Sequence, residues 1–160
     1  MNRNTIENIF NFLKEKEGKE LPKNWNIIER LENHPDDIQY RYDGILSLSD
    51  SNITKLPNDL YVDGSLYLVE TNITKLPDKL YVDRSLSLRH CNQITELPNK
   101  LHVGGILSLS ETNISELPNK LYVRRDLYIN DTPLSDKYTD EEITEMIASK
   151  GGTLIGKIYR

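Results

Sequence analysis

The chain has 160 residues and a formal net charge of -5. This length allows a single domain, and the acidic balance argues against a general nucleic-acid binder, which usually carries an excess of Lys and Arg. One cysteine, Cys91, cannot form an internal disulfide framework. No stretch contains the ~18 consecutive apolar residues of a membrane span, and the N-terminus lacks the small-residue cleavage site of a secretory signal. We therefore expect a soluble, cytoplasmic protein.

The first residues are expected to form an amphipathic helix. Asn4 and Glu7 have the spacing of a capping box, and apolar residues then recur at helical intervals as far as Gly18. Such a helix either covers the first rung of a repeat array or docks on a partner or a membrane surface. We favour the cover, because stacked repeats need capped ends.

A second helical segment is expected soon afterwards. Trp25, Ile28 and Leu31 have helical spacing, and Pro35 ends the run. Trp25 is the only Trp in the chain, and we expect it in the core rather than at an interface. Residues 21–27 and 42–46 resemble parts of the repeats described next, which indicates a degenerate first repeat with an insertion from about residue 28 to residue 40.

Residues 46–134 consist of repeats with a period of about twenty residues, the signature of a solenoid. The four full units are LSLSDSNITKLPNDLYVDGS from Leu46, LYLVETNITKLPDKLYVDRS from Leu66, LSLRHCNQITELPNKLHVGGI from Leu86 and LSLSETNISELPNKLYVRRD from Leu107, and a partial unit starts at Leu127. Alternation in L-x-L predicts a short strand with inward leucines, and a unit this short leaves room only for parallel stacking. Pro77 and its equivalents exclude a regular helix from the return path.

The sixth position of the repeat carries a small side chain with a donor group, in Ser51, Thr71, Cys91, Thr112 and Thr132. We expect these side chains to satisfy backbone groups at the bend after each strand, from one rung to the next. Cys91 is therefore interpreted as a buried structural residue and not as a nucleophile.

The repeat resembles the leucine-rich repeat, specifically the short bacterial type with L-P-x-x-L that occurs in bacterial effectors and in small bacterial or phage proteins. The resemblance implies an α/β fold, a right-handed solenoid with a parallel sheet on its concave face. It also implies protein binding. The expected organisation is one domain, residues 1–160, with a helical N-terminal cap (1–45), repeats (46–134) and a helix–strand C-terminal cap (135–160).

The C-terminal residues predict the second cap. Thr139 and Glu142 form a capping box, and Ile143, Met146 and Ile147 would be the buried face of the following helix. Residues 153–159 then read as one strand with a glycine irregularity. Together with the last repeat strand, these elements predict a closing βαβ unit that shields the edge of the sheet.

No pattern in the chain points to catalysis. The three histidines have no ligand spacing with Cys91, and neither a phosphate-binding glycine loop nor a nucleophile elbow is present. We expect a protein that is not an enzyme and that has no cofactor and no metal site.

The candidate binding residues are those that depart from the serines beside the repeated leucines. They are Tyr67, Val69, Arg89, Ile106, Tyr128 and Asn130. Strand alternation turns them to the concave face, and Tyr and Arg are enriched in interface hot spots. The leading hypothesis is a protein-binding module with an unidentified protein partner, and an inhibitor of a bacterial host or defence protein if the chain is phage-encoded.

Two alternatives remain open. In the first alternative, the chain is a structural component that oligomerises through its caps or edges, although we favour a monomer. Otherwise it binds nucleic acid through the opposite face, where the column Tyr61, Tyr81, His102 and Tyr122 runs beside Lys79, Lys100, Lys120, Arg84, Arg124 and Arg125. Interspersed acids favour a simpler interpretation of that face, an aromatic ladder flanked by solvated charges.

Overall fold

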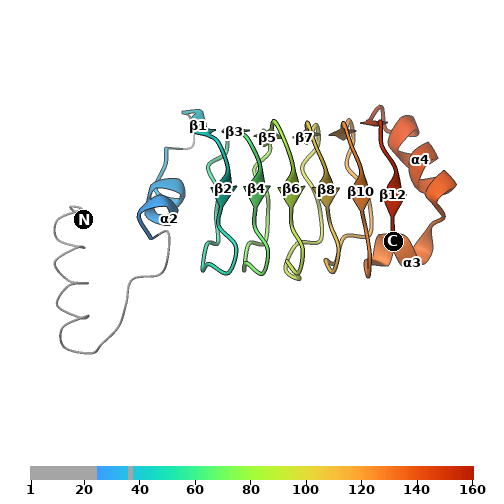
Figure 1. Ribbon diagram of the computed structural model, residues 1–160, viewed down its shortest axis with the longest axis horizontal. Helices are drawn as coiled ribbons and strands as arrows, with labels where there is room; N and C mark the ends of the chain where they lie inside the picture. The colour runs from blue at the N-terminus through green and yellow to red at the C-terminus, as the bar shows by residue number, and fades with distance from the viewer. Residues whose placement is uncertain (1–24, 36–37) are drawn as a thin grey trace.

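The computed structural model describes residues 25–35 and 38–160, and the helix expected from Asn4 to Gly18 lies outside this range. The described chain is a parallel β-solenoid (Figure 1). Consecutive strands alternate between two six-stranded parallel sheets, in the orders β1-β3-β5-β7-β9-β11 and β2-β4-β6-β8-β10-β12. We call these the odd sheet and the even sheet. A rung is one odd strand with the turn and the even strand that follow it.

The strands are short. The odd strands are β1 (Tyr40–Asp43), β3 (Leu60–Asp63), β5 (Tyr81–Val82), β7 (His102–Val103), β9 (Tyr122–Val123) and β11 (Thr153–Leu154). The even strands are β2 (Leu46–Ser47), β4 (Leu66–Tyr67), β6 (Leu86–Ser87), β8 (Leu107–Ser108), β10 (Leu127–Tyr128) and β12 (Ile158–Tyr159). The L-x-L motif therefore forms the expected parallel sheet, and the L-x-V motif forms a second one that the repeat pattern did not predict.

Backbone hydrogen bonds hold each rung to the next. Leu66 lies opposite Leu46 on one side and Leu86 on the other. The bonding continues beyond the two-residue strands, because the N–H of Leu68 donates to the carbonyl oxygen of Ser87 at 2.9 Å. Equivalent residues thus lie directly above one another, one repeat apart.

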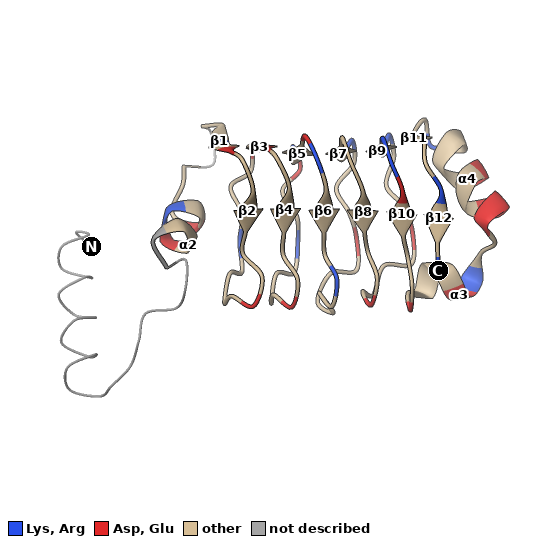
Figure 2. Cartoon of the chain, viewed as in Figure 1, with Lys and Arg blue, Asp and Glu red and all other residues tan. Residues whose placement is uncertain are grey.

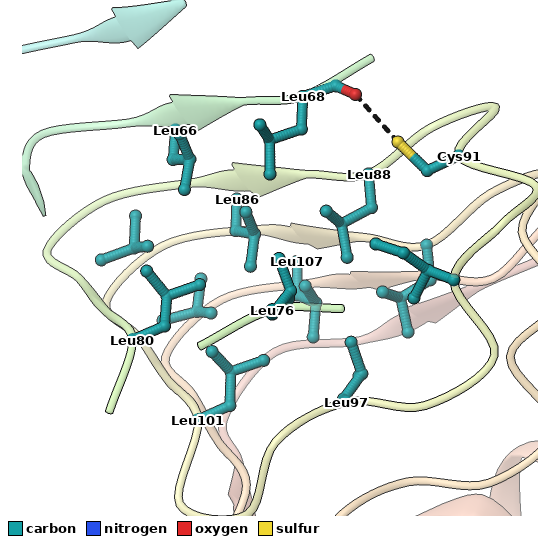
Figure 3. Close-up of a cluster of buried hydrophobic side chains, with 14 of the residues drawn as sticks. Leu66, Leu68, Leu76, Leu80, Leu86, Leu88, Cys91, Leu97, Leu101 and Leu107 are labelled. Atoms are coloured by element: carbon teal, nitrogen blue, oxygen red, sulfur yellow. Dashed lines mark hydrogen bonds between the residues drawn. The ribbon is translucent and has the colours of Figure 1, made fainter. Parts of the chain in front are cut away.

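The repeated apolar residues fill the space between the two sheets (Figure 3). Leu66, Leu68 and Leu76 are fully buried, as are Leu86 and Leu88 in the next rung. Between Ile53 and the next odd strand the chain is extended or in turns, without a helix, as the repeated Pro predicted. The inward and outward assignments made from L-x-L are confirmed in each of these rungs.

The sixth-position column is buried and forms hydrogen bonds, but mostly within its own rung. The hydroxyls of Thr71, Thr112 and Thr132 each donate to the carbonyl three residues earlier. Cys91 alone reaches the preceding rung, donating to the carbonyl oxygen of Leu68 at 2.8 Å (Figure 3). The expected contact from rung to rung therefore holds for Cys91 only. A threonine hydroxyl is close enough to its own strand end to satisfy the nearer carbonyl.

At the N-terminal end, helix α2 (Trp25–Glu32) confirms the second predicted helix. Leu31 is fully buried at the end of the core, and Ile28 is partly buried. β1 pairs with β3 in register, so a first rung precedes the recognised repeats as predicted. Residues 25–27, the described part of the repeat-like match over residues 21–27, begin a helix instead of a repeat rung. The helical spacing of the apolar residues Trp25, Ile28 and Leu31 is a stronger structural signal than the weak repeat pattern.

At the C-terminal end, the predicted helix is α4 (Asp140–Ser149), with Thr139 and Glu142 in a reciprocal capping box. A short helix that was not predicted, α3 (Pro133–Lys137), precedes it and is capped by Thr132. Ile143 and Ile147 are buried.

The single strand predicted over residues 153–159 is wrong. The segment forms β11 and β12, which pair with β9 and β10 on different sheets and make a further rung. The turn between them contains Gly156, where a Cβ atom would lie 2.5 Å from the backbone carbon of Arg125. These strands are the last of both sheets, and α4 packs against β11 at this end of the stack (Figure 1).

The alternation in the even sheet leads to a paired prediction on stability. Leu88→Ala should lower the free energy of unfolding by about 2–5 kcal/mol, because it opens a cavity in a closely packed core. Ser87→Ala should change it very little, since the Ser87 side chain faces outward. Urea denaturation of both variants measures the difference. Equal losses would show that the inward and outward assignments are incorrect.

Candidate binding face

The outward face of the even sheet presents one column of side chains for each variable repeat position. In register, the first column contains Ser47, Tyr67, Ser87, Ser108, Tyr128 and Tyr159. Because the leucines beside them point inward, these side chains have no part in the core. Tyr67 near the N-terminal end is separated by two small serines, Ser87 and Ser108, from two adjacent tyrosines at the C-terminal end.

The tyrosines at the C-terminal end form a pair. The rings of Tyr128 and Tyr159 are stacked, with centroids 4.7 Å apart and planes 13° apart. Tyr159 is 41% exposed, so the pair presents an aromatic surface to solvent. Stacking pre-orients both rings, which lowers the entropy lost when a partner binds.

Tyr159 was not among the residues predicted from the sequence. The signal was present: Leu154 to Tyr159 reads LIGKIY, which matches VDGSLY from Val62 to Tyr67. The departure of Ile155 and Lys157 from the other turns, and the helices inserted before them, concealed this last rung.

Arg89 lies in the next column and forms an ion pair. Its guanidinium group donates to Glu111 from Nε at 3.2 Å and from Nη2 at 3.0 Å. His90 Nδ1 lies 2.8 Å from the other oxygen of the same carboxylate. Glu111 is a partner that the sequence did not reveal, because it belongs to the neighbouring rung. The Arg89 side chain is 56% exposed, and the pair therefore leaves it accessible to a ligand.

The structure brings some of the predicted residues together and separates others. Tyr67 and Val69 belong to one rung and Arg89 to the adjacent one, so these three form a compact group. Asn130 lies two rungs from Arg89, where its Oδ1 accepts a hydrogen bond from the hydroxyl of Ser110 at 3.1 Å. Ile106 lies at the other end of its strand, beside a hollow in the turns.

The outward face of the odd sheet carries the predicted aromatic ladder. Tyr61, Tyr81, His102 and Tyr122 are stacked, with successive centroids 4.7, 4.2 and 4.5 Å apart and planes within 8° of parallel. The guanidinium carbon of Arg41 lies 4.5 Å from the centroid of Tyr61 and covers the first ring. The rings thus stack on each other, rung upon rung.

Burial in the ladder shifts the pKa of two of its residues. Burial lowers the pKa of His102, an effect that the nearby carboxylate of Asp83 partly opposes. Burial also raises the pKa of the Tyr81 phenol, with smaller contributions from Tyr61 and Asp83. Both pKa shifts favour the uncharged forms of His102 and Tyr81.

The described part of the chain shows no group of three or more His, Cys, Asp or Glu residues that would hold a metal ion. Cys91 is completely buried there, with its thiol bonded to a backbone carbonyl. Among the described helices, none is both long and apolar enough to cross a bilayer.

Comparisons with known proteins give no match: no protein-family model fits the sequence, and none is found among curated proteins or among solved structures.

The buried imidazole of His102 leads to a prediction on pH dependence. Its pKa is lower in the folded state than the value of ~6.5 in an unfolded chain, so below that pH the unfolded state binds the additional proton. The free energy of unfolding should therefore fall as the pH drops through 6.5. His102→Tyr, which continues the tyrosine column, should weaken this dependence. Urea unfolding of both proteins at pH 7.5 and 5.5 tests it, and an unchanged difference between the two pH values would contradict it.

Proposed function

We propose that this chain is a non-catalytic module, built as a leucine-rich-repeat-type right-handed solenoid, that binds a protein partner on the outward face of the even sheet. The observation that carries the proposal is the group formed by Tyr67, Val69 and Arg89 on two adjacent rungs. Elsewhere in this face small polar side chains predominate. An aromatic, an aliphatic and a guanidinium side chain in contact with solvent are the components of an interface hot spot.

The fold does not need these three side chains. The ion pair between Arg89 and Glu111 is exposed, and exposed ion pairs contribute ~0–1 kcal/mol. Tyr67 and Val69 are half-buried against their own sheet, while the core positions beside them are occupied by Leu66 and Leu68. These two side chains leave apolar surface exposed to solvent, and a bound protein partner would cover that surface.

The stacked pair of Tyr128 and Tyr159 sets the length of the proposed contact. Tyr67 and Tyr128 are three rungs apart, which is about 14 Å at the usual strand spacing. Ser87 and Ser108, which have small polar side chains, lie between them in the column. A helix of about ten residues has this length, so one helix or loop of the partner would reach both tyrosine groups.

The resemblance to the short bacterial repeats suggests the setting. Proteins with such repeats typically bind other proteins. If a phage encodes this chain, we propose that it inhibits a bacterial host or defence protein by binding to it.

Assembly through the sheet ends is the second candidate. β11 and β12 end the two sheets, and the turn between them exposes Ile155, which is 62% accessible. An unpaired parallel edge with apolar neighbours favours pairing with another chain.

Nucleic-acid binding is less well supported by the odd face. Single-stranded nucleic acids bind by stacking bases on exposed aromatic faces. Here the ring faces of the ladder are already stacked on each other, and Arg41 covers Tyr61.

The binding proposal predicts that Tyr67→Ala with Arg89→Ala abolishes capture of the partner, with little change in melting temperature. The immobilised protein is incubated with lysate of the organism that encodes it, and bound proteins are quantified by mass spectrometry. The matched control is Tyr61→Ala with Arg41→Ala, which removes the same residue types from the odd face.

A partner that is lost with the first double variant and kept with the control supports the even face. Equal capture by the two double variants would rule it out. Light scattering over a range of concentrations separates the assembly alternative, because only end-to-end pairing makes the apparent mass rise with concentration.

A further inference from the structure

The turns between the odd and even strands form a hollow of about 930 Å³. Each turn follows L-x-V, and equivalent turn residues lie above one another from rung to rung. In the rung of β7 and β8 the turn is Gly104-Gly105, which has no side chains. The neighbouring turns carry Asp83-Arg84 on one side and Arg124-Arg125 on the other. Their basic residues are the blue segments at the turns leading into β6 and β10 in Figure 2.

The glycines are required by close packing of the rungs. A Cβ atom on Gly104 would lie 2.1 Å from the carbonyl oxygen of Asp83, and one on Gly105 would lie 2.8 Å from the backbone carbon of Arg84. The close packing of the turns therefore excludes a side chain at Gly104 and Gly105, and the hollow stays open in this rung.

The three arginines that line the hollow differ from the other arginines of residues 38–160. Arg41, Arg89 and Arg160 each form an ion pair with a carboxylate. The side chains of Arg84, Arg124 and Arg125 have no hydrogen-bond or ion-pair partner within residues 25–35 and 38–160. Asp83 is the one carboxylate in the lining, so the hollow has an excess of two positive charges.

Two serine hydroxyls complete the lining with donor groups. The Oγ of Ser65 accepts from the N–H of Ser85 at 3.3 Å, and the Oγ of Ser85 accepts from the N–H of Ile106 at 3.2 Å. Neither hydroxyl donates to another group among the described residues, and both side chains line the hollow. Guanidinium groups and hydroxyl protons together are suited to an oxyanion, and the planar fork of Arg matches phosphate oxygens.

The arrangement limits the anion to a compact one. Arg84 and Arg125 lie two rungs apart, about 10 Å at the usual strand spacing. Beyond Arg125 this column continues with Gly156, and beyond Arg84 it continues with Gly64 and Gly44. In the adjacent column, Asp63 and then Asp43 follow Asp83. An extended polyanion would meet these acids, whereas one or two phosphate groups would contact the arginines alone. Ile106 and Ile155 add an apolar surface beside the charges.

We infer that this hollow is a binding site for a small phosphate-bearing molecule, held by Arg84, Arg124 and Arg125 with the hydroxyls of Ser65 and Ser85. The site is separate from the protein-binding group on the even face, and neither proposal depends on the other.

The test is a titration of the ¹⁵N-labelled full chain with pyrophosphate, followed by the amide resonances of Gly104 and Gly105, with ionic strength held constant by NaCl. We expect saturable shifts at both glycines. Arg84→Ala with Arg125→Ala should weaken the affinity at least tenfold, and Arg30→Ala, which removes an exposed arginine from α2 at the far end, should not change it. Because both substituted arginines are exposed, the variant should retain the spectrum of the folded chain.

Titrations with three further ligands test which chemical group of a ligand the hollow binds. Adenosine 5′-diphosphate should bind and adenosine should not, because the contacts are made to phosphate. Binding of oligothymidylate that strengthens with length and exceeds that of pyrophosphate would overturn the proposal in favour of a nucleic-acid track. Shifts that NaCl alone reproduces, or that Arg84→Ala with Arg125→Ala leaves unchanged, would overturn it as well.

Discussion

The structure depends on the hydrogen bonds between successive rungs. Strands of two residues make too few bonds to hold a sheet by pairing alone, so the bonding extends into the flanking turns, where Arg84 N–H donates to Gly64 and Leu68 N–H to Ser87. Such continuity requires each rung to follow nearly the same path as its neighbour. The repeat period of about twenty residues is the sequence expression of this requirement. The buried leucine columns then stabilise a stack whose geometry the backbone has already set.

The structural roles of residues that recur from rung to rung could be predicted from the sequence. Leu66, Leu68 and their equivalents are buried, the aromatic column is a ladder, and the capping box at Thr139 begins a helix. Each follows from a local pattern or from copying one rung onto the next. The second sheet was missed because two residues of L-x-V carry little strand signal on their own.

The candidate sites were predicted less completely, for a physical reason. The partner of Arg89 is Glu111 in the next rung, and the hollow exists because a glycine pair lies between two arginine-bearing turns. Both features arise from differences between neighbouring repeats, and they become visible only when the register is known. Tyr159 belongs to a rung whose pattern is interrupted by α3 and α4. The sequence signal for Tyr159 lies in the single rung LIGKIY and not in a complete repeat.

Positions that stacking leaves free are therefore where binding is expected. The even face and the turn hollow share this origin, because both consist of variable positions placed on an invariant frame. The frame also explains their rigidity, since side chains such as Tyr128 and Tyr159 are oriented by contact between rungs.

The claim that stacking sets the structure is tested most directly by amide hydrogen exchange, measured by NMR on the native protein. The N–H groups of Leu48, Leu68, Leu88, Leu109 and Ile129 donate to the following rung. These five amides should exchange slowly and with similar protection, because they open only when rungs separate. Rapid exchange at the inner members, Leu68, Leu88 and Leu109, as fast as that of exposed turn residues, would contradict the proposed stack.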